Sequence, residues 1–312
     1  MSASTEPAAK LITLEQAVRD HVPDGSSVVL GACLEPMIPF AFTREIIRQG
    51  KRGLDIVAPI SDASTDMLIG AGCVARVTGA WVGNVSGGLG HNYRRAVERG
   101  VPHPVAVADH SNFSLGMALL AGAYGLPYAP IRSLLGSDIL KSNPALRVVD
   151  NPLEPGEPVV LVPPLTPDVA LLAVQRADRF GNSHFWGSTG VSQEAAMAAG
   201  RVVLLAEEIV APEVIAADPN RVLYPGFRVA AVVAATAGVH PSPMTGVWQR
   251  DTAFLDEYHR RSRERDGFLA WLDEWVLEPA GHPAYLARLG DRLGRLRIKG
   301  SAPSPPANFA AT

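Results

Sequence analysis

The feature that most constrains this sequence is a series of short apolar runs, each ending at glycine or polar residues. Ser27 to Gly31, Leu54 to Ala58 and Val74 to Val82 are the first three runs, and a helical pattern follows each of the first two. Short runs that are apolar throughout are typical of strands buried on both faces, as in parallel sheets. Strand, loop and helix at this spacing predict an α/β fold with an open, mostly parallel sheet flanked by helices.

The same alternation continues along the rest of the chain. Further strands are expected at 105–108, 159–162, 169–174, 202–206 and 229–235, and helices after Thr13 and at 40–50, 64–70, 111–124 and 252–298. The segment 150–158 is rich in turn-forming residues and is interpreted as a connector.

The two ends of the chain differ in composition from the middle. Residues 1–10 are polar and alanine-rich, and residues 299–312 are rich in proline, alanine and serine. Such segments bury little apolar surface. We therefore expect a flexible arm at 1–10, one main domain at 11–298 and a flexible tail at 299–312.

Charge and hydropathy exclude several classes of function. The 28 basic and 31 acidic residues give a net charge of -3, which provides no electrostatic reason to expect nucleic acid or an anionic membrane as a partner. The N-terminus lacks the apolar core of a signal peptide, and no run of 18 apolar residues could span a membrane. We expect a cytoplasmic protein.

Cysteines and histidines give no metal signature. Cys33 and Cys73 are too few for a disulfide framework or a thiolate metal site, and both lie in apolar contexts typical of buried thiols. The eight histidines show no HExxH grouping. The sequence therefore predicts no metal site.

An open parallel sheet binds its ligands beyond the carboxyl ends of its strands. The loops at Gly31, 83–90, 109–112, 178–182 and 207–208 all follow predicted strands. We expect the functional site to lie among these loops.

The glycine-rich loop 83–90 (GNVSGGLG) precedes a basic helix, and glycine backbones approach anions closely at a helix N-terminus. It fits neither a Walker loop nor the GxGxxG spacing, so a phosphate cradle and an ordinary tight loop both remain open.

No nucleophile is identified by local pattern. Ser86, Ser111 and Ser188 lie outside a GxSxG elbow. Glu207 with Glu208 is either a base or a capping or subunit-contact pair, and the turn at 178–182 is either structural or part of the site.

Taken in order, several blocks resemble the alpha subunits of family I CoA-transferases, most closely the glutaconate CoA-transferase type. They are LPYAPIRSLLGSDIL at 126–140, VQRADRFGN at 174–182, LLAEEIV at 204–210, DPNRVLYPG at 218–226 and AGVHPSP at 237–243 with Arg250-Asp251 after it. The resemblance covers roughly residues 11–260, and 261–298 match less well.

The resemblance implies a family I CoA-transferase subunit fold for 11–298 and a ping-pong transfer of CoA between an acyl-CoA and a carboxylic acid. It places the nucleophilic glutamate, and a glutamyl-CoA thioester, on a partner beta-type subunit in an α2β2 or larger assembly. This chain then carries no catalytic nucleophile and needs no cofactor, because the coenzyme A thioester is the substrate. The Glu-x-Gly at 98–100 is interpreted as a helix end.

The resemblance also implies which residues line the acyl-CoA site. The family places part of its oxyanion hole after the first strand, where this chain has Gly-Ala-Cys in place of Gly-Gly-Phe. The predicted substrate-binding residues are Gly31, Ala32, Asn84, Ser86, Gly87, Ser111, Asn112, Phe113, Gly136, Ser137 and His240.

Two other functions stay open at this point. A related branch hydrolyses a cyclic CoA thioester in steroid ring degradation, and carries an acidic residue where this chain has Asp109 to Asn112. Ser-Asn-Phe at 111–113 favours the transferase type. A non-catalytic acyl-CoA-binding subunit is the third alternative.

Overall fold

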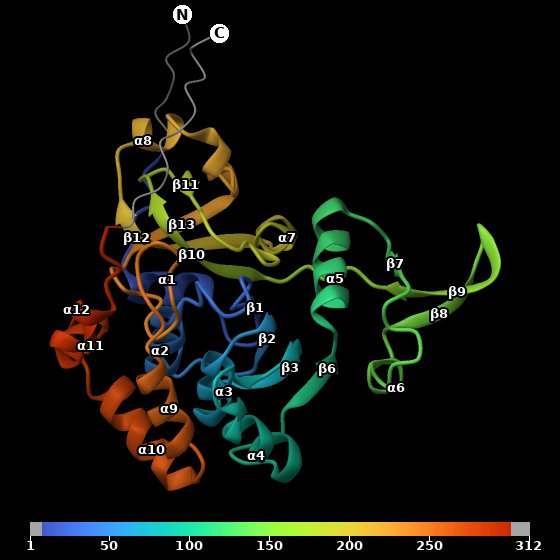
Figure 1. Ribbon diagram of the computed structural model, residues 1–312, viewed down its shortest axis with the longest axis horizontal. Helices are drawn as coiled ribbons and strands as arrows, with labels where there is room; N and C mark the ends of the chain where they lie inside the picture. The colour runs from blue at the N-terminus through green and yellow to red at the C-terminus, as the bar shows by residue number, and fades with distance from the viewer. Residues whose placement is uncertain (1–7, 301–312) are drawn as a thin grey trace, which may run out of the picture.

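A computed structural model describes residues 8–300. Its centre is an eight-stranded sheet with the strand order β13-β12-β10-β1-β2-β3-β6, whose pairs are all parallel, and β11 is paired antiparallel with β10 (Figure 1). The strands are β1 (Ser27–Val29), β2 (Leu54–Ile60), β3 (Val74–Trp81), β6 (Ala106–Asp109), β10 (Val169–Ala177), β11 (Ser183–His184), β12 (Arg201–Ile209) and β13 (Val229–Ala234). The predicted open, mostly parallel sheet is confirmed.

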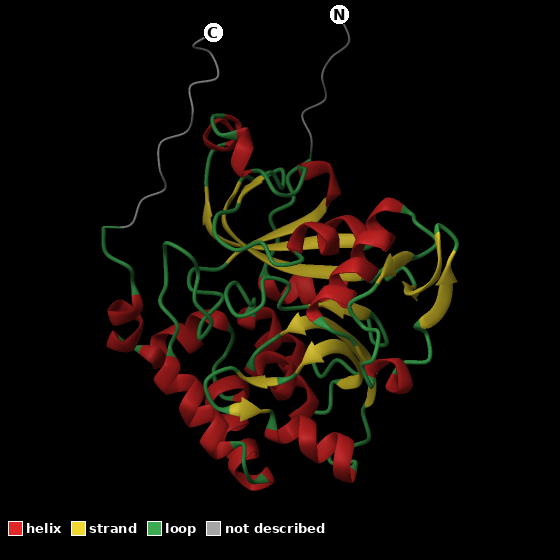
Figure 2. Ribbon diagram, turned by 45° about the vertical axis from the view of Figure 1, so that its right-hand side comes forward, coloured by secondary structure: helices red, strands yellow, loops and turns green. Residues whose placement is uncertain are grey.

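Helices flank this sheet (Figure 2). They are α1 (Leu14–His21), α2 (Phe40–Arg48), α3 (Ala63–Gly70), α4 (His91–Arg99), α5 (Asn112–Tyr124), α6 (Ile139–Ser142), α7 (Ser192–Ala198), α8 (Pro212–Ala216), α9 (Thr252–Arg261), α10 (Arg265–Leu272), α11 (His282–Leu289) and α12 (Asp291–Leu296). Neighbours α1, α2 and α3 pack in a row, and α5 packs against α7.

The order of the strands places a switch point in the middle of the sheet. From β1 the chain proceeds through β2 and β3 to β6 in one direction, whereas β10, β12 and β13 extend in the other. The loops that leave β1 and β10 therefore turn away from each other at the carboxyl ends of these strands, which is where open α/β sheets bind ligands.

Part of the predicted strand pattern is wrong. The strand expected at 159–162 does not join the parallel sheet, because it is the end of β9 (Glu154–Val162), which lies between β7 (Ala129–Ile131) and β8 (Arg147–Asn151) in a separate antiparallel sheet. Most of the predicted connector 150–158 belongs to the β8–β9 hairpin. Its residues are nearly all exposed, and most are charged, proline or glycine, so no apolar alternation marked it as a strand.

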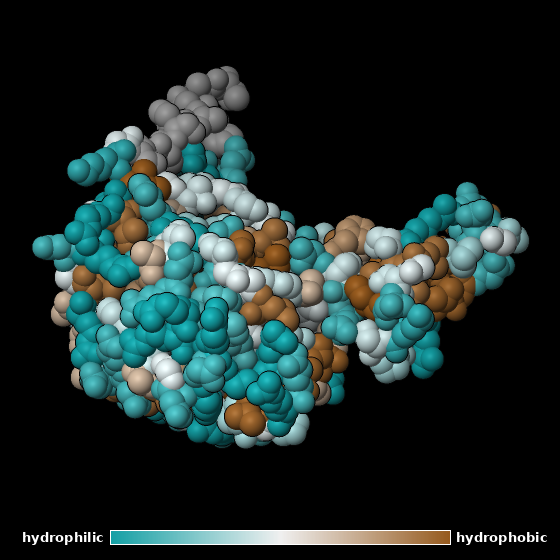
Figure 3. Space-filling view, turned by 60° about the horizontal axis from the view of Figure 1, so that its bottom comes forward, coloured by the Kyte–Doolittle hydropathy of each residue, from teal (hydrophilic) through white to brown (hydrophobic). Residues whose placement is uncertain are grey.

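This three-stranded sheet, here called the arm, projects to one side of the main body (Figure 1). Apolar side chains gather on its surface in the space-filling view (Figure 3), and Tyr128, Val148 and Leu153 are exposed there. The arm contains Glu154-Pro155-Gly156, a second Glu-x-Gly besides the one at 98–100.

The ends of the chain are only partly described. Residues 1–7, most of the segment 1–10 that was expected to be flexible, and residues 301–312 of the predicted tail lie outside the described residues. Lys10 is held: its amide donates to the carbonyl of Arg179 at 2.8 Å, and its carbonyl accepts from the amide of Val232 at 2.9 Å. Within 8–300, no helix is long and apolar enough to cross a membrane, and no cluster of three metal-ligating side chains is found.

A crevice at the carboxyl ends of β1 and β2

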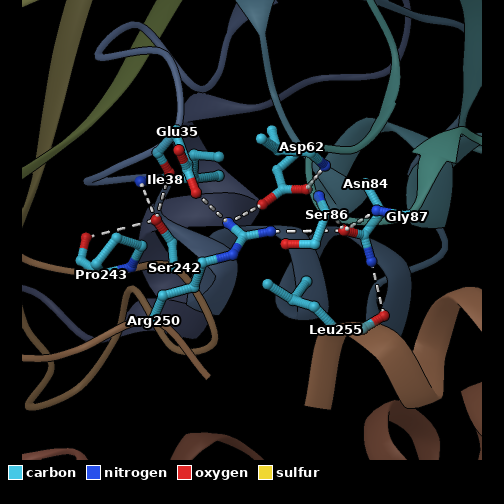
Figure 4. Close-up of polar contacts among 11 residues, drawn as sticks. Glu35, Ile38, Asp62, Asn84, Ser86, Gly87, Ser242, Pro243, Arg250 and Leu255 are labelled. Carbon is cyan, nitrogen blue, oxygen red and sulfur yellow. Dashed lines mark hydrogen bonds and ion pairs between the residues drawn. The ribbon is translucent and has the colours of Figure 1, made fainter. Parts of the chain in front are cut away.

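Four segments that are distant in sequence converge beyond β1 and β2. They are the loop 31–39, the turn at Ser61-Asp62, the hairpin of β4 (Gly83–Asn84) and β5 (Gly88–Leu89), and the segment 242–250 (Figure 4). The predicted glycine-rich loop 83–90 is therefore a small hairpin, and it opens α4 as expected.

Gly31 allows the first of these loops to leave its strand. Its φ is +77°, and a Cβ at this position would lie 2.8 Å from the carbonyl oxygen of Ile60 at the end of β2. Only glycine adopts this conformation at so close a contact without strain. The loop continues through Leu34 and Met37, which have left-handed φ values of 68° and 62°. Such residues are uncommon and cluster at functional sites.

Arg250 lies at the centre of the crevice. Its Nη1 is 2.5 Å from Oδ2 of Asp62 and 3.0 Å from Oε1 of Glu35, and its Nη2 is 3.5 Å from Oδ1 of Asn84. The side chain of Arg250 is 12% exposed, that of Asp62 is 0% and that of Glu35 is 41%. We call Arg250, Asp62 and Glu35 the Arg250 cluster.

Asn84 holds the hairpin beside this cluster. Its amide nitrogen donates to the carbonyl of Leu255 at 2.8 Å, and its Oδ1 accepts from the amides of Ser86 at 2.9 Å and Gly87 at 3.2 Å. Because Asn84 is buried while Ser86 and Gly87 are exposed, it fixes two solvent-facing backbone positions over the crevice. The structure thus brings three predicted site residues to one place.

His240 has a different environment. It is 4% exposed, its Nδ1 lies 2.6 Å from the hydroxyl of Tyr285, and its Nε2 lies 3.0 Å from Oδ2 of Asp251. Arg292 also pairs with Asp251 through both carboxylate oxygens. With both ring nitrogens engaged, His240 fits a positioning role for the segment that carries Arg250. We call His240, Asp251, Tyr285 and Arg292 the Asp251 cluster.

The charged and polar groups of the Asp251 cluster are paired with one another. Burial opposes ionisation of Asp251, but hydrogen bonds from His240 and Arg292 outweigh it and hold the pKa of this carboxyl well below its usual range. Burial also lowers the pKa of His240, which the hydrogen bond to Asp251 opposes only in part. Asp251 additionally caps α9 by accepting from the amide of Phe254 at 3.0 Å.

The other predicted site residues occupy two further places. Ser111 is the N-cap of α5, where its hydroxyl accepts from the amide of Ser114 at 3.0 Å, and Asn112 and Phe113 are exposed in the first turn. This turn follows β6 at the same edge of the sheet. Gly136 and Ser137 instead lie between β7 and α6, in the segment that connects the strands of the arm.

Ala32 connects the crevice to the other half of the sheet. Its carbonyl accepts from the amide of Val191 at 2.8 Å, just before α7. A Cβ on Gly190 would lie 2.8 Å from the Cα of Cys33. Gly31 and Ala32 therefore lie between the ends of β2 and α7, on the switch-point side of the crevice.

Two candidate features away from the crevice have structural partners. The turn at 178–182 is closed by Asp178, whose Oδ1 accepts from the amides of Phe180 at 2.8 Å and Asn182 at 3.0 Å. Glu207 accepts from the amide of Ala237 at 2.7 Å, and burial raises its pKa, while Glu208 pairs with Arg176 at 3.0 Å.

Sequence reasoning missed Glu35, Asp62, Arg250 and Ser242. Asp62 follows the second predicted strand by a few residues, so the rule on strand ends could have found it. Arg250 was noted only as part of a matching block, and its partner Asp62 is 188 residues away. No local pattern reports such a pairing.

An open parallel sheet with charged and polar side chains gathered beyond the carboxyl ends of neighbouring strands is the architecture of an α/β enzyme or of one component of a larger enzyme. The chain belongs to the coenzyme A transferase family, whose model matches residues 11–235.

Known relatives agree along most of the chain. One subunit of 3-oxoadipate CoA-transferase from Pseudomonas knackmussii is 38% identical, over 91% of this chain and 99% of the relative. The crystal structure of glutaconate CoA-transferase from Acidaminococcus fermentans superposes with a TM-score of 0.89 at 30% identity, over 97% of this chain and 100% of that chain. The decarboxylase AibA/AibB superposes with a TM-score of 0.72 at 30% identity, over 86% and 99%. The predicted family is confirmed.

Proposed function

We propose that this chain is the alpha-type subunit of a two-subunit CoA-transferase that moves CoA between an acyl-CoA and a dicarboxylic acid. The observation that carries this proposal is the nearly full-length agreement with CoA-transferase subunits in sequence and fold. The acids in the names of these relatives, 3-oxoadipate and glutaconate, both carry two carboxylates.

In this proposal the nucleophile is a glutamate of the partner subunit. Its carboxylate attacks the thioester carbonyl and displaces the CoA thiolate, and the thiolate then attacks the resulting anhydride at the glutamyl carbonyl. The first acid leaves, and a glutamyl-CoA thioester remains for the reverse sequence with the second acid.

Neither Glu-x-Gly of this chain supports a nucleophile here. The one at 98–100 ends α4, where Gly100 is the C-cap with a φ of +66°, and Glu98 pairs with Arg94 at 3.0 Å. The other begins β9 in the arm, where Glu154 is exposed and pairs with Arg132. Both glutamates lie on other segments than the four that form the crevice.

This chain would contribute the walls and the backbone donors of the site. Gly31 and Ala32 begin the loop beyond β1, where amide groups can face the oxyanion that forms at the thioester carbonyl. Ser86 and Gly87 lie across the guanidinium of Arg250 from Glu35 (Figure 4). The acyl-CoA would bind between these two loops, with Asn112 and Phe113 farther along the same edge.

Co-expression with the beta-type partner tests the proposal. The purified complex should transfer CoA from glutaryl-CoA to an acceptor acid, whereas this chain alone should show no transfer. Release of free CoA at the same rate without an acceptor acid would favour the hydrolase alternative. Binding of glutaryl-CoA with no turnover would favour a non-catalytic role.

A further inference from the structure

The positive charge of Arg250 is already neutralised by Asp62, without any contribution from Glu35. The carboxylate of Asp62 is fully buried, pairs with Nη1 of Arg250 at 2.5 Å and accepts the amide of Val85 at 3.0 Å on its other oxygen. A buried charge requires such a partner. Glu35 is therefore a second carboxylate on the same nitrogen, and the Arg250 cluster has a net charge of -1.

Glu35 is held by its backbone and not by its carboxylate. Its carbonyl accepts from the hydroxyl of Ser242 at 2.8 Å, and two residues on the amide of Met37 donates to the carbonyl of Pro243 at 2.9 Å. The side chain extends from this anchored loop to Arg250 (Figure 4). The carboxylate can therefore change position by rotation about the side-chain torsions of Glu35 while the loop stays anchored.

The two ion pairs of Arg250, with Asp62 and with Glu35, differ in strength. Part-exposed ion pairs are weak because water competes for both partners, whereas the loss of one member of a buried pair is costly. Asp62 is 0% exposed and Glu35 is 41% exposed. A dissolved carboxylate can therefore replace Glu35 on Arg250, but it cannot replace Asp62.

We infer that Arg250 recognises the non-reacting carboxylate of the acid substrate, and that Glu35 is an internal carboxylate that occupies this position until the substrate displaces it. The inference rests on the proposed function and adds a specificity-determining residue and a built-in competitor to it. The held carboxylate is the non-reacting one, because pairing with a buried guanidinium makes a carboxylate a poorer nucleophile.

Glu35→Gln in the two-subunit complex tests the competitor. The KM for glutarate, a five-carbon dicarboxylate, should fall by about threefold to fivefold, the effect of removing a part-exposed ion pair. The kcat should stay within about twofold of wild type, and the KM for acetate, which has no second carboxylate, should not change. Glu98→Gln is the matched control, since Glu98 is 48% exposed and pairs with Arg94 at the same 3.0 Å.

Arg250→Lys tests the recognition site. Lysine keeps the positive charge beside Asp62 but lacks the rigid, planar guanidinium that places Nη1 within reach of Asp62 and of a second carboxylate. The KM for glutarate should rise about tenfold or more, and kcat/KM for acetate should stay within about threefold. A higher glutarate KM in Glu35→Gln would overturn the inference by making Glu35 an aid to binding. A loss of kcat of about a hundredfold in Glu35→Gln, at constant KM, would also overturn the inference, because Glu35 would then be a catalytic residue.

Calorimetric titration of glutarate into the full chain separates this inference from the proposed function. If the complex transfers no CoA to any acid, tighter glutarate binding by Glu35→Gln than by wild type still supports the inference. If transfer occurs but the two proteins bind glutarate equally, the inference fails and the proposed function stands.

Discussion

Arg250 and Asp251 are neighbours in the chain, but they belong to two clusters of opposite character. Asp251 is 4% exposed and is bound by His240, Arg292 and the amide of Phe254. Arg250 is also mostly buried, but one of its carboxylate partners, Glu35, is 41% exposed. The Asp251 cluster is closed, whereas the Arg250 cluster has a contact that solvent can reach.

The difference shows how one segment can combine a fixed position with an exchangeable contact. The closed cluster and the cap on α9 hold the backbone at Asp251, and this places the guanidinium of Arg250 at the crevice. Preorganised groups of this kind bind ligands with little further ordering. The closed cluster should therefore control stability, and the open one should control binding.

Loss of the buried Asp251 cluster should have the largest effect on stability. Asp251→Ala should lower the free energy of unfolding by about 3–5 kcal/mol, because it leaves Arg292 and His240 without their shared partner and removes a helix cap. Chemical denaturation of the complex measures this loss. Asp256→Ala, an exposed position on the same helix, is the control and should change stability by less than about 0.5 kcal/mol.

An unchanged stability of Asp251→Ala together with lost transfer would contradict a purely structural role for the Asp251 cluster. That result would make Asp251 part of the reacting site, and His240 would then be a candidate for proton transfer.

A second effect is the pH dependence of the closed side. Burial lowers the pKa of His282, which stacks on Tyr285, to about 4. Its pKa in the unfolded chain is about 6.5. Between these values the unfolded chain binds a proton that the folded chain does not, so stability is complete above about pH 6.5 and falls as the pH drops toward about 4.

The size of this effect is up to about 3 kcal/mol for His282. His282→Gln should remove this part of the slope, as measured by unfolding at about pH 7, 5.5 and 4. Asp251 contributes little in this window, because a carboxyl whose pKa is lowered in the folded state begins to lose its stabilising effect only as the pH falls toward its unfolded-state pKa of about 3.9. Equal slopes in the variant and the wild type would show that His282 does not titrate in this way.

The smallest effects lie at the start of α5 and define where the open crevice ends. The structure makes Ser111 the cap, so Ser111→Ala should cost about 1 kcal/mol of stability. Asn112 is exposed beside it, and we expect Asn112→Ala to lower kcat/KM about tenfold with an unchanged melting temperature, a loss of about 1.4 kcal/mol of transition-state binding. Normal kinetics for Asn112→Ala would place this turn outside the crevice.

The sequence predicted the frame of the molecule better than its site. The apolar runs predicted the parallel strands because burial on both faces leaves a local pattern. The antiparallel sheet of the arm was not predicted, because β9 begins with exposed residues such as Glu154 and Glu157 that show no such pattern. Parallel strand ends also predicted that Gly31 and Asn84 meet at one edge.

The Arg250 cluster could not be predicted in the same way. Asp62 and Arg250 meet because α3 packs against both α2 and α9. No local sequence pattern predicts a contact between residues so far apart in the chain. Glu35 lies in a loop whose left-handed residues, Leu34 and Met37, have side chains that do not favour that conformation. Its orientation toward Arg250 depends on tertiary contacts.

The most direct test of the account is to find which glutamate carries the intermediate. The wild-type complex should be incubated with glutaryl-CoA, treated with borohydride, and analysed by peptide mass spectrometry, because reduction marks the glutamyl thioester. We predict that one glutamate of the partner chain is modified and that no residue of this chain is. Modification of Glu35, the part-exposed carboxylate beside Arg250, would contradict both the assignment of the nucleophile to the partner chain and the role of Glu35 as a displaceable partner of Arg250.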